Sequence, residues 1–166
     1  MNNVRYEIEL YEPMCRWLEQ KLKDTYKGKK CEIIVKDSHS VTLDKILEEY
    51  GLIDNYPQAV GVDIQIDVIG MVIFDKKSEL IFIEAKKNAL NLHDLGQLWA
   101  YCKLIDPAQA YLLSSANLGS LNKILKNLNR EDLLDFGNNK IIKKMYVGKW
   151  DVMRNTIDNN SLIPKI

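Results

Sequence analysis

Apolar and polar residues alternate strictly along residues 62–68. The apolar positions are Val62, Ile64, Ile66 and Val68, and the polar positions between them are Asp63, Gln65 and Asp67. A period of two is typical of a strand whose two faces meet different surroundings. A second apolar run, residues 80–87, follows the short polar segment 75–79. The pattern therefore predicts an antiparallel hairpin whose turn centres near Asp75 and Lys76.

Helical spacing of apolar positions predicts four helices, at residues 13–27, 43–50, 92–105 and 118–136. The first opens at Pro13, a favoured first helical position, and stops at Gly28. The second follows Thr42, a good cap residue. The third stops at Asp106-Pro107, because the residue before a proline disfavours the helical conformation. Its apolar stripe is predicted to be Leu95, Leu98, Trp99, Cys102 and Leu104 or Ile105.

Three further strands are predicted, at residues 31–37, 108–115 and 140–148. The residues after this last strand are predicted to form a polar tail. The resulting order is helix, strand, short helix, hairpin, helix, strand, helix and strand. This order predicts one α/β domain over residues 1–166, with a mixed central sheet flanked by helices.

Composition sets limits on the classes of function. Apolar residues make up 46% of the 166 residues, enough to bury a core. The 23 basic and 23 acidic residues cancel, which argues against a purely electrostatic nucleic-acid binder but not against a nuclease with a carboxylate-rich site. The three cysteines form no C-x-x-C pair, so neither a zinc site nor a disulfide framework is expected. Residues 1–10 contain no apolar signal region, and we expect a soluble, cytoplasmic protein with no membrane partner.

The predicted hairpin brings candidate chemistry together. If its turn lies near residue 75, Asp67 falls opposite Glu84, with side chains about 5 Å apart. Two carboxylates at that distance repel one another unless a cation lies between them, and Mg²⁺ accepts carboxylates, a carbonyl and waters as ligands. The backbone carbonyl of Ala85 is placed to be a third ligand, and Lys86 shares the face of Glu84. Lys86 would orient or deprotonate a water, or steady a phosphate.

Ile66-Asp67 followed by the stretch IFIEAKK at residues 81–87 resembles the Asp and (D/E)-x-K motifs of the PD-(D/E)XK nuclease superfamily. The order of elements over residues 9–115 is similar to that family's restriction-endonuclease-like αβββαβ core, which also occurs in Holliday-junction resolvases. Residues 116–166 would then be a C-terminal extension that adds a helix and a strand. No proline precedes Asp67, so the first letter of the family's motif is missing.

The resemblance implies further site residues. The stretch DLGQLWAYCKL is similar to the helix that follows the motif in some members, which makes Gln97 a secondary active-site candidate. The first helix of such folds often supplies an acidic residue to the metal, for which Glu9 or Glu12 is the candidate here, and Glu7 stays open. Asp63 competes with Asp67 for the role of metal ligand.

We therefore expect a Mg²⁺-dependent endonuclease that hydrolyses DNA phosphodiester bonds, with Mn²⁺ able to replace Mg²⁺. A homodimer is compatible with this function, because one site cuts one strand of a duplex. The alternative is a catalytically inactive protein of the same fold that serves as a DNA-binding or assembly module. Phosphate contacts are expected from lysines on the surface, and the candidates are Lys29, Lys30, Lys87, Lys143 and Lys144. His39 and His93 are expected at the surface.

Overall fold

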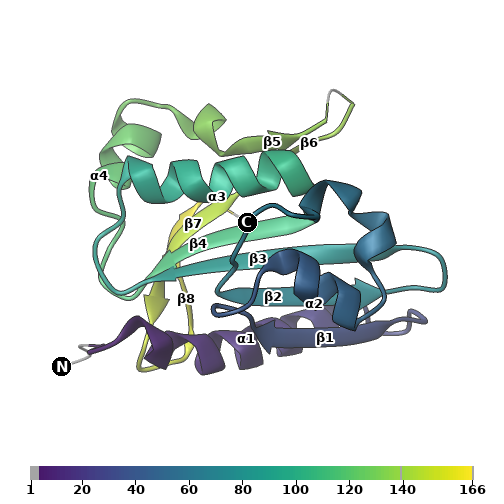
Figure 1. Ribbon diagram of the computed structural model, residues 1–166. Helices are drawn as coiled ribbons and strands as arrows, with labels where there is room; N and C mark the ends of the chain where they lie inside the picture. The colour runs from purple at the N-terminus through teal and green to yellow at the C-terminus, as the bar shows by residue number, and fades with distance from the viewer. Residues whose placement is uncertain (1–3, 139, 166) are drawn as a thin grey trace.

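The computed structural model describes residues 4–138 and 140–165, and its centre is a sheet of six strands in the order β1-β2-β3-β4-β7-β8 (Figure 1). The strands are β1 Glu32–Asp37, β2 Val68–Ile73, β3 Ser78–Lys86, β4 Gln109–Ser114, β7 Tyr146–Asp151 and β8 Thr156–Ile163. Neighbours pair antiparallel except at β3–β4 and β4–β7, which are parallel. The predicted α/β class with a mixed sheet is confirmed.

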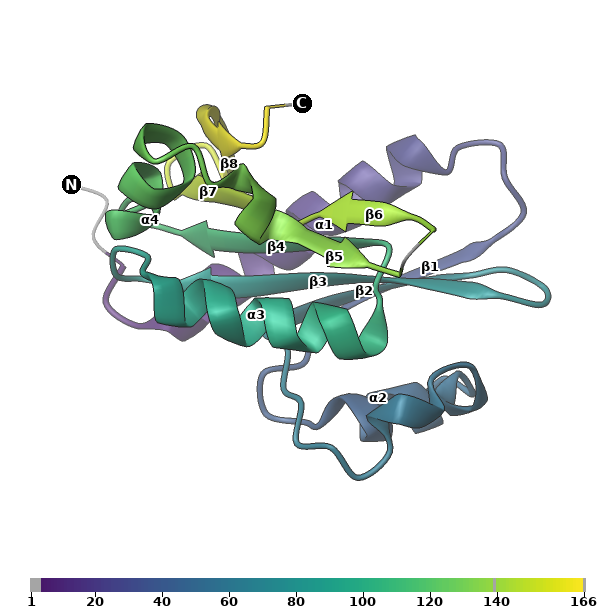
Figure 2. The same ribbon diagram turned by 90° about the horizontal axis from the view of Figure 1, so that it is seen from above.

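Helices cover both faces of this sheet (Figure 2). Helix α1 (Tyr11–Thr25), which follows the 3₁₀ turn η1 (Glu7–Leu10), lies on one face. Helices α2 (Leu43–Glu49) and α3 (Leu92–Ile105) lie on the other. Two short 3₁₀ turns, η2 and η3, follow α2 at Ile53–Asn55 and Pro57–Ala59.

Strand β3 is buried on both faces, which explains its nearly continuous apolar run. Leu80 and Phe82 point into the core beneath α3, and Ile81 and Ile83 point into the core beneath α1. Continued alternation turns Glu84 and Lys86, at the end of the strand, towards the α3 side of the sheet.

The predicted hairpin is confirmed, but its first strand is shorter than predicted. Val68 pairs with Ile83, and the turn is closed by the Phe74 N–H, which donates to the Lys77 carbonyl at 2.8 Å. The prediction of a strand from residue 62 is wrong, because β2 begins only at Val68. Backbone groups of the preceding residues bond elsewhere: the Leu43 N–H donates to the carbonyl of Ile64 at 2.8 Å.

The predicted helix at residues 118–136 is broken into short turns. Helix α4 covers Ser120–Asn122 and continues as a π-helical turn, η4, over Lys123–Asn127. A 3₁₀ turn, η5 (Glu131–Leu134), and strand β5 (Asp135–Gly137) follow. The helix stops because Asn129 adopts the left-handed conformation, with φ of 54°. The leucines of the predicted apolar stripe are nevertheless buried at Leu121, Leu125 and Leu134.

The C-terminal region contributes more strands than predicted. The single strand expected at residues 140–148 is two strands, β6 (Ile142–Lys144), which pairs with β5, and β7. The predicted polar tail is wrong, because residues 156–163 form β8 at the edge of the main sheet. An edge strand needs few apolar residues, and here only Ile157, Leu162 and Ile163 are buried.

Two of the residues predicted for the apolar stripe of α3 lie at the surface. Leu95, Leu98, Cys102 and Ile105 are buried, as predicted. Trp99 is 40% exposed and Leu104 is 44% exposed. The indole N–H of Trp99 donates to the Asp135 carbonyl at 3.0 Å, so this side chain lies against β5 rather than in the core.

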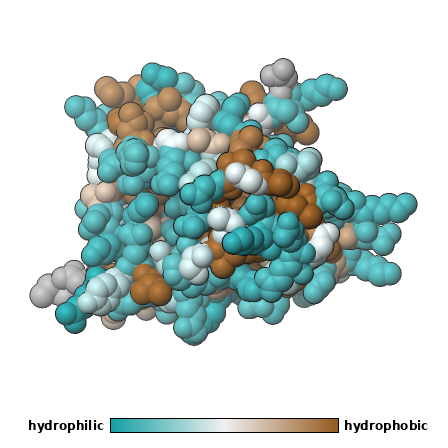
Figure 3. Space-filling view, viewed as in Figure 1, coloured by the Kyte–Doolittle hydropathy of each residue, from teal (hydrophilic) through white to brown (hydrophobic). Residues whose placement is uncertain are grey.

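The face of the molecule in Figure 3 is mostly hydrophilic, with apolar residues gathered near its centre. Exposed Val60 and Val62 lie in the segment between α2 and β2. Within the described residues, none of the helices is long and apolar enough to cross a bilayer.

Candidate functional site

Asp67 and Glu84 meet where β2 begins and β3 ends. The pairing of Val68 with Ile83 places Asp67 directly opposite Glu84, as the sequence predicted. The Ala85 N–H donates to Asp67 Oδ2 at 2.8 Å and fixes this carboxylate against β3. Because Asp67 precedes the first residue of β2, its carboxylate takes a bond that the ladder would otherwise supply.

Glu84 is buried and incompletely bonded. Its side chain is only 5% exposed, and its Oε1 atom has no hydrogen-bond partner among the described residues. Burial, together with the nearby charge of Asp67, raises the pKa of Glu84 to about 8. A buried carboxylate oxygen without a partner is costly, and nearly all such groups in folded proteins are satisfied. This oxygen therefore marks a place where a bound ligand would supply the interaction that the described residues do not.

Asp67 is also held away from water. Burial is the largest effect on the pKa of Asp67 and raises it, while the bond from the Ala85 N–H and the charge of Lys86 act in the opposite direction. Two adjacent carboxyl groups with raised pKa values share protons when no cation is present, because both cannot easily be charged together. The pair is therefore ready to exchange a proton for a cation.

Lys86 follows Glu84 by two residues and lies on the same face of β3. Its charge lowers the pKa of Asp67 and of Glu84, so its ammonium group lies within electrostatic range of both. No carboxylate of the described residues lies within 4.0 Å of Lys86 Nζ as an ion-pair partner. The half-buried ammonium is therefore available to a water molecule or a phosphate.

The N-terminal segment supplies Glu7 rather than Glu9 or Glu12. Glu7 Oε2 accepts from the Lys87 N–H at 3.3 Å, and its charge contributes to the raised pKa of Asp67. Glu9 instead accepts from the Tyr6 N–H at 2.6 Å at the start of η1. Glu12 pairs with Arg16 at the surface, at 2.5 Å.

Tyr11 also reaches the site from α1, and no pattern in the sequence indicates this. Its hydroxyl lies close enough to Asp67 to lower the pKa of that carboxyl. Burial, and then the charge of Asp67, raise the pKa of Tyr11 far above its ordinary value. Tyr11 therefore keeps its proton and presents its hydroxyl to the Asp67 carboxylate.

Two other predicted residues are not brought to this pair. Asp63 is exposed in the irregular segment before β2, and none of the described contacts connects it with Asp67 or Glu84. Gln97 is exposed on α3, and its amide donates to the Tyr101 hydroxyl at 3.3 Å. Asp67, rather than Asp63, is the aspartate that faces Glu84.

The end of β1 forms another wall of the site. The Ser38 N–H donates to the Asp67 carbonyl at 3.0 Å, and the Ser38 hydroxyl donates to the Ile66 carbonyl. The His39 ring lies against Tyr11 with centroids 4.9 Å apart, and its Nδ1 lies 2.5 Å from Asp37 Oδ1. His39 was expected at the surface and is only half-exposed. A prediction that β1 pairs with β2 would have indicated that Ser38 and His39 lie beside Asp67.

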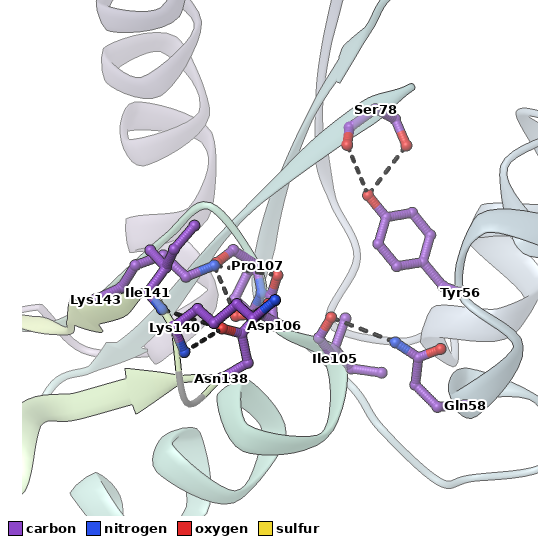
Figure 4. Close-up of polar contacts among 10 residues, drawn as sticks. All are labelled: Tyr56, Gln58, Ser78, Ile105, Asp106, Pro107, Asn138, Lys140, Ile141 and Lys143. Carbon is purple, nitrogen blue, oxygen red and sulfur yellow. Dashed lines mark hydrogen bonds and ion pairs between the residues drawn. The ribbon is translucent and has the colours of Figure 1, made fainter. Parts of the chain in front are cut away.

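Most of the lysines predicted to bind phosphate do not lie beside Asp67 and Glu84. Lys143 Nζ lies 2.7 Å from Asp106 Oδ1 and donates to the Pro107 carbonyl, near the start of β4 (Figure 4). Lys144 pairs with Asp135. Lys29 and Lys30 precede β1, which starts beside the hairpin turn at the other end of β2.

Lys87 is the predicted lysine that stays beside the site. Its N–H donates to Glu7, and its ammonium donates to the Arg5 carbonyl at 3.2 Å.

The donor set suits a hard divalent cation held partly by water. The described residues contain no group of three or more Asp, Glu, His or Cys side chains arranged to hold a metal ion. Mg²⁺ typically uses one or two carboxylates and keeps several waters. The N–H and C=O of one strand residue point to the same side, so the Ala85 carbonyl points towards Asp67, past the start of β2. Asp67, Glu84 and this carbonyl fit such an ion, and the orphaned Glu84 Oε1 is the oxygen it would satisfy.

No protein-family model, curated protein or solved structure matches this chain.

Proposed function

We propose that this protein is a Mg²⁺-dependent nuclease that hydrolyses phosphodiester bonds of DNA. The observation that carries the proposal is the buried, unpartnered Oε1 of Glu84 beside the carboxylate of Asp67. A structural ion pair would have satisfied both groups, whereas a bound cation satisfies them only when it is present. Lys86, which has no carboxylate partner within 4.0 Å among the described residues, lies within electrostatic range of this pair.

The arrangement of elements supports the same proposal. The order α1-β1-β2-β3-α3-β4 resembles the αβββαβ core of PD-(D/E)XK nucleases, with α2 inserted between β1 and β2. Asp67, Glu84 and Lys86 follow the order of that family's motif, with Asp67 just before β2 and the other two residues on β3.

Each side chain has a defined task in this proposal. Asp67 and Glu84 hold the ion together with the Ala85 carbonyl, and Tyr11 keeps Asp67 in position. When bound, Mg²⁺ would polarise the scissile phosphate and lower the pKa of a water molecule. Lys86 orients that water or stabilises the charge that develops on the phosphate. A homodimer, with one site for each strand of a duplex, stays a prediction.

Calorimetric titration with Mg²⁺ and Mn²⁺ tests the ion site directly. We expect the wild-type protein to bind either ion and Glu84→Gln to lose that binding. Glu12→Gln is the matched control, because Glu12 is an exposed glutamate paired with Arg16 and should leave binding unchanged. Equal binding by the wild type and Glu84→Gln would contradict the proposed site.

A second candidate function is a DNA-binding or assembly module that has lost catalysis. The small number of carboxylates in the site favours it, since among the described residues two acidic side chains, with Glu7 nearby, surround the proposed ion. Incubation with linear and branched DNAs in Mn²⁺ separates the two candidates. Cleavage that disappears in Glu84→Gln supports the nuclease, and metal binding without cleavage of any substrate supports the module.

A further inference from the structure

Three polar residues form a row across adjacent strands at the end of the sheet that carries Glu84. Lys86 on β3 pairs with Ser114 on β4, and Ser114 pairs with Lys149 on β7. Directly paired residues point to the same face of a sheet, and neighbouring strands lie about 4.8 Å apart. The backbones of Lys86 and Lys149 are therefore roughly 10 Å apart, with both side chains on the α3 side.

Lys149 lines a polar groove that lies beyond the end of β4. The groove has a volume of about 370 Å³, and its polar lining residues are Asn117, Asn122, Lys126, Lys149, Asn160 and Ser161. Among the described residues, no carboxylate lines it. Four other grooves of the described residues are each lined by at least one carboxylate, so the groove beside Lys149 differs from them in charge.

The two lysines of this groove are not neutralised by neighbours. Within the described part of the chain, neither Lys126 nor Lys149 has an ion-pair partner within 4.0 Å. Asp158 pairs with Lys149 in the β7–β8 ladder, but its Oδ1 accepts from the Asn160 N–H at 3.0 Å. Lys126 lies in the π-helical turn η4, a backbone form that is frequent at functional sites.

The groove is held in a fixed position relative to the carboxylate pair. The Ser115 N–H donates to the Lys86 carbonyl at 3.0 Å, and the Leu90 N–H donates to the Asn117 carbonyl at 3.2 Å. A Cβ atom on Gly119 would lie 2.2 Å from the Leu90 carbonyl oxygen, so the two loops touch where only glycine fits. The chain after β3 and the chain after β4 therefore form one continuous rim (Figure 1).

We infer that this groove binds the phosphodiester backbone of the nucleic-acid strand whose scissile phosphate lies at Glu84 and Lys86. The inference rests on the proposed nuclease function and names a substrate contact for it. Lysines and uncharged amide and hydroxyl groups are the side chains that contact phosphate and sugar in nucleic-acid complexes. A span of roughly 10 Å corresponds to about three base-pair steps along the axis of a duplex, at about 3.4 Å each. Lys149 and Lys126 would thus hold phosphates a few nucleotides from the cut.

The test uses the full chain and a fluorescein-labelled single-stranded DNA of twelve nucleotides, without divalent metal. Binding is measured by anisotropy at several salt concentrations for the wild type, Lys126→Ala/Lys149→Ala and Lys29→Ala/Lys30→Ala. The second double variant removes the same charge next to the opposite end of the sheet. We expect Lys126→Ala/Lys149→Ala to weaken binding at least tenfold and to reduce the slope of log K against log salt by about 1.4, because each contact to a single strand contributes about 0.7.

Several results would overturn this inference. Equal losses in the two double variants would show that net charge alone matters, and no loss in Lys126→Ala/Lys149→Ala would exclude the groove. Absence of any DNA binding by the wild type at low salt would exclude it as well. Competition by inorganic phosphate at concentrations far below those of ordinary salt effects would instead assign the groove to a free phosphate. Metal binding at Glu84 is measured separately by calorimetry, so the proposed function can fail or stand independently of this result.

Discussion

Polar side chains at the two ends of the central sheet differ in whether they have partners within the protein. Where β3 and β4 begin, polar groups find partners within the protein: Lys143 pairs with Asp106, and the Tyr56 hydroxyl lies 3.0 Å from Ser78 Oγ (Figure 4). Where the same strands finish, Glu84 Oε1 has no partner, and Lys86 has no carboxylate within ion-pair distance in the described residues.

The difference separates groups that stabilise the fold from groups that await a ligand. Folding normally satisfies buried polar atoms, so an end of a sheet that leaves them unsatisfied is less stable than it would be with apolar residues. Local violations of this kind are expected at functional sites. The finishing end of the sheet is therefore where we place the ion, the scissile phosphate and the nucleic-acid strand.

Substitution of Glu84 should give the largest effect. We expect Glu84→Gln to reduce the rate of DNA cleavage by at least about 10³-fold, because it removes a ligand of the ion that stabilises the transition state. Asp106→Asn, at the starting end of the sheet, is the matched control and should cleave at the wild-type rate. Initial rates on a labelled substrate in Mg²⁺ and in Mn²⁺ measure both. Comparable losses in the two variants would remove the distinction between the two ends.

The stability of the metal-free protein should fall as the pH rises. The pKa of Glu84 is raised from its ordinary 4.5 to about 8, so the folded protein holds a proton that the unfolded chain releases between these values. The free energy of unfolding should therefore decrease from about pH 4.5 to about pH 8, by on the order of 5 kcal/mol. Urea unfolding at several pH values measures this slope.

Two comparisons identify Glu84 as the source of that slope. Glu84→Gln carries no titrating group at this position and should show a flatter dependence on pH. Addition of Mg²⁺ should restore stability mainly at the alkaline end of the window, because the ion binds the deprotonated carboxylates. A wild-type slope that persists unchanged in Glu84→Gln would assign the titration to another group.

Loss of the Lys86 ammonium should slow cleavage without removing the ion. We expect Lys86→Met to reduce the rate by about 10²-fold, since general acid–base or phosphate assistance from one side chain is typically of this size. Calorimetry should still detect Mg²⁺ binding, which distinguishes this variant from Glu84→Gln. Lys87→Met is the neighbouring control, because Lys87 contacts the N-terminal segment. Similar losses for both lysines would indicate a general effect of charge.

Tyr11 should act as a positioning residue. Removal of its hydroxyl takes away an interaction that lowers the pKa of Asp67, so Tyr11→Phe should shift the pH dependence of metal binding upwards and slow cleavage by about three- to tenfold. Tyr26→Phe is the matched control, since the Tyr26 hydroxyl donates to Glu79 near the hairpin turn. A purely structural role for Tyr11 would change stability and leave the pH dependence in place.

Much of the finishing end of the sheet could be predicted from the sequence, because it depends on local patterns. Two apolar runs and the short polar turn between them determine the register, and the register brings Asp67 to Glu84 and Lys86 beside them. Asp67 faces Glu84, and Asp63 does not, because β2 begins at Val68. That point depends on Ser38 and α2, whose contacts with residues 64–67 no local pattern reveals.

Contacts between distant segments account for what was missed. Glu7 and Tyr11 reach the site because η1 and α1 cross the end of β3, whereas spacing within one helix could not distinguish Glu7 from Glu9 or Glu12. Lys149 joins Lys86 only through the pairing of β4 with β7, a parallel pairing between segments separated by more than thirty residues. For the converse reason the sequence could not show that Lys143, a predicted phosphate-binding lysine, pairs with Asp106, because this acidic partner comes from a distant part of the chain.

The smallest effect is expected at the starting end of the sheet, where Lys143 contributes to the fold and not to the reaction. Its side chain is 25% exposed and that of Asp106 is 41% exposed, so water weakens their ion pair. The ammonium also donates to the Pro107 carbonyl at 2.7 Å. We expect Lys143→Met to lower the free energy of unfolding by about 1 kcal/mol or less and to leave the cleavage rate unchanged. Lys45→Met removes an exposed lysine of α2 and controls for net charge in both measurements. If Lys143→Met instead slowed cleavage while its stability matched that of the control, the starting end would take part in the function, and the contrast between the two ends would not hold.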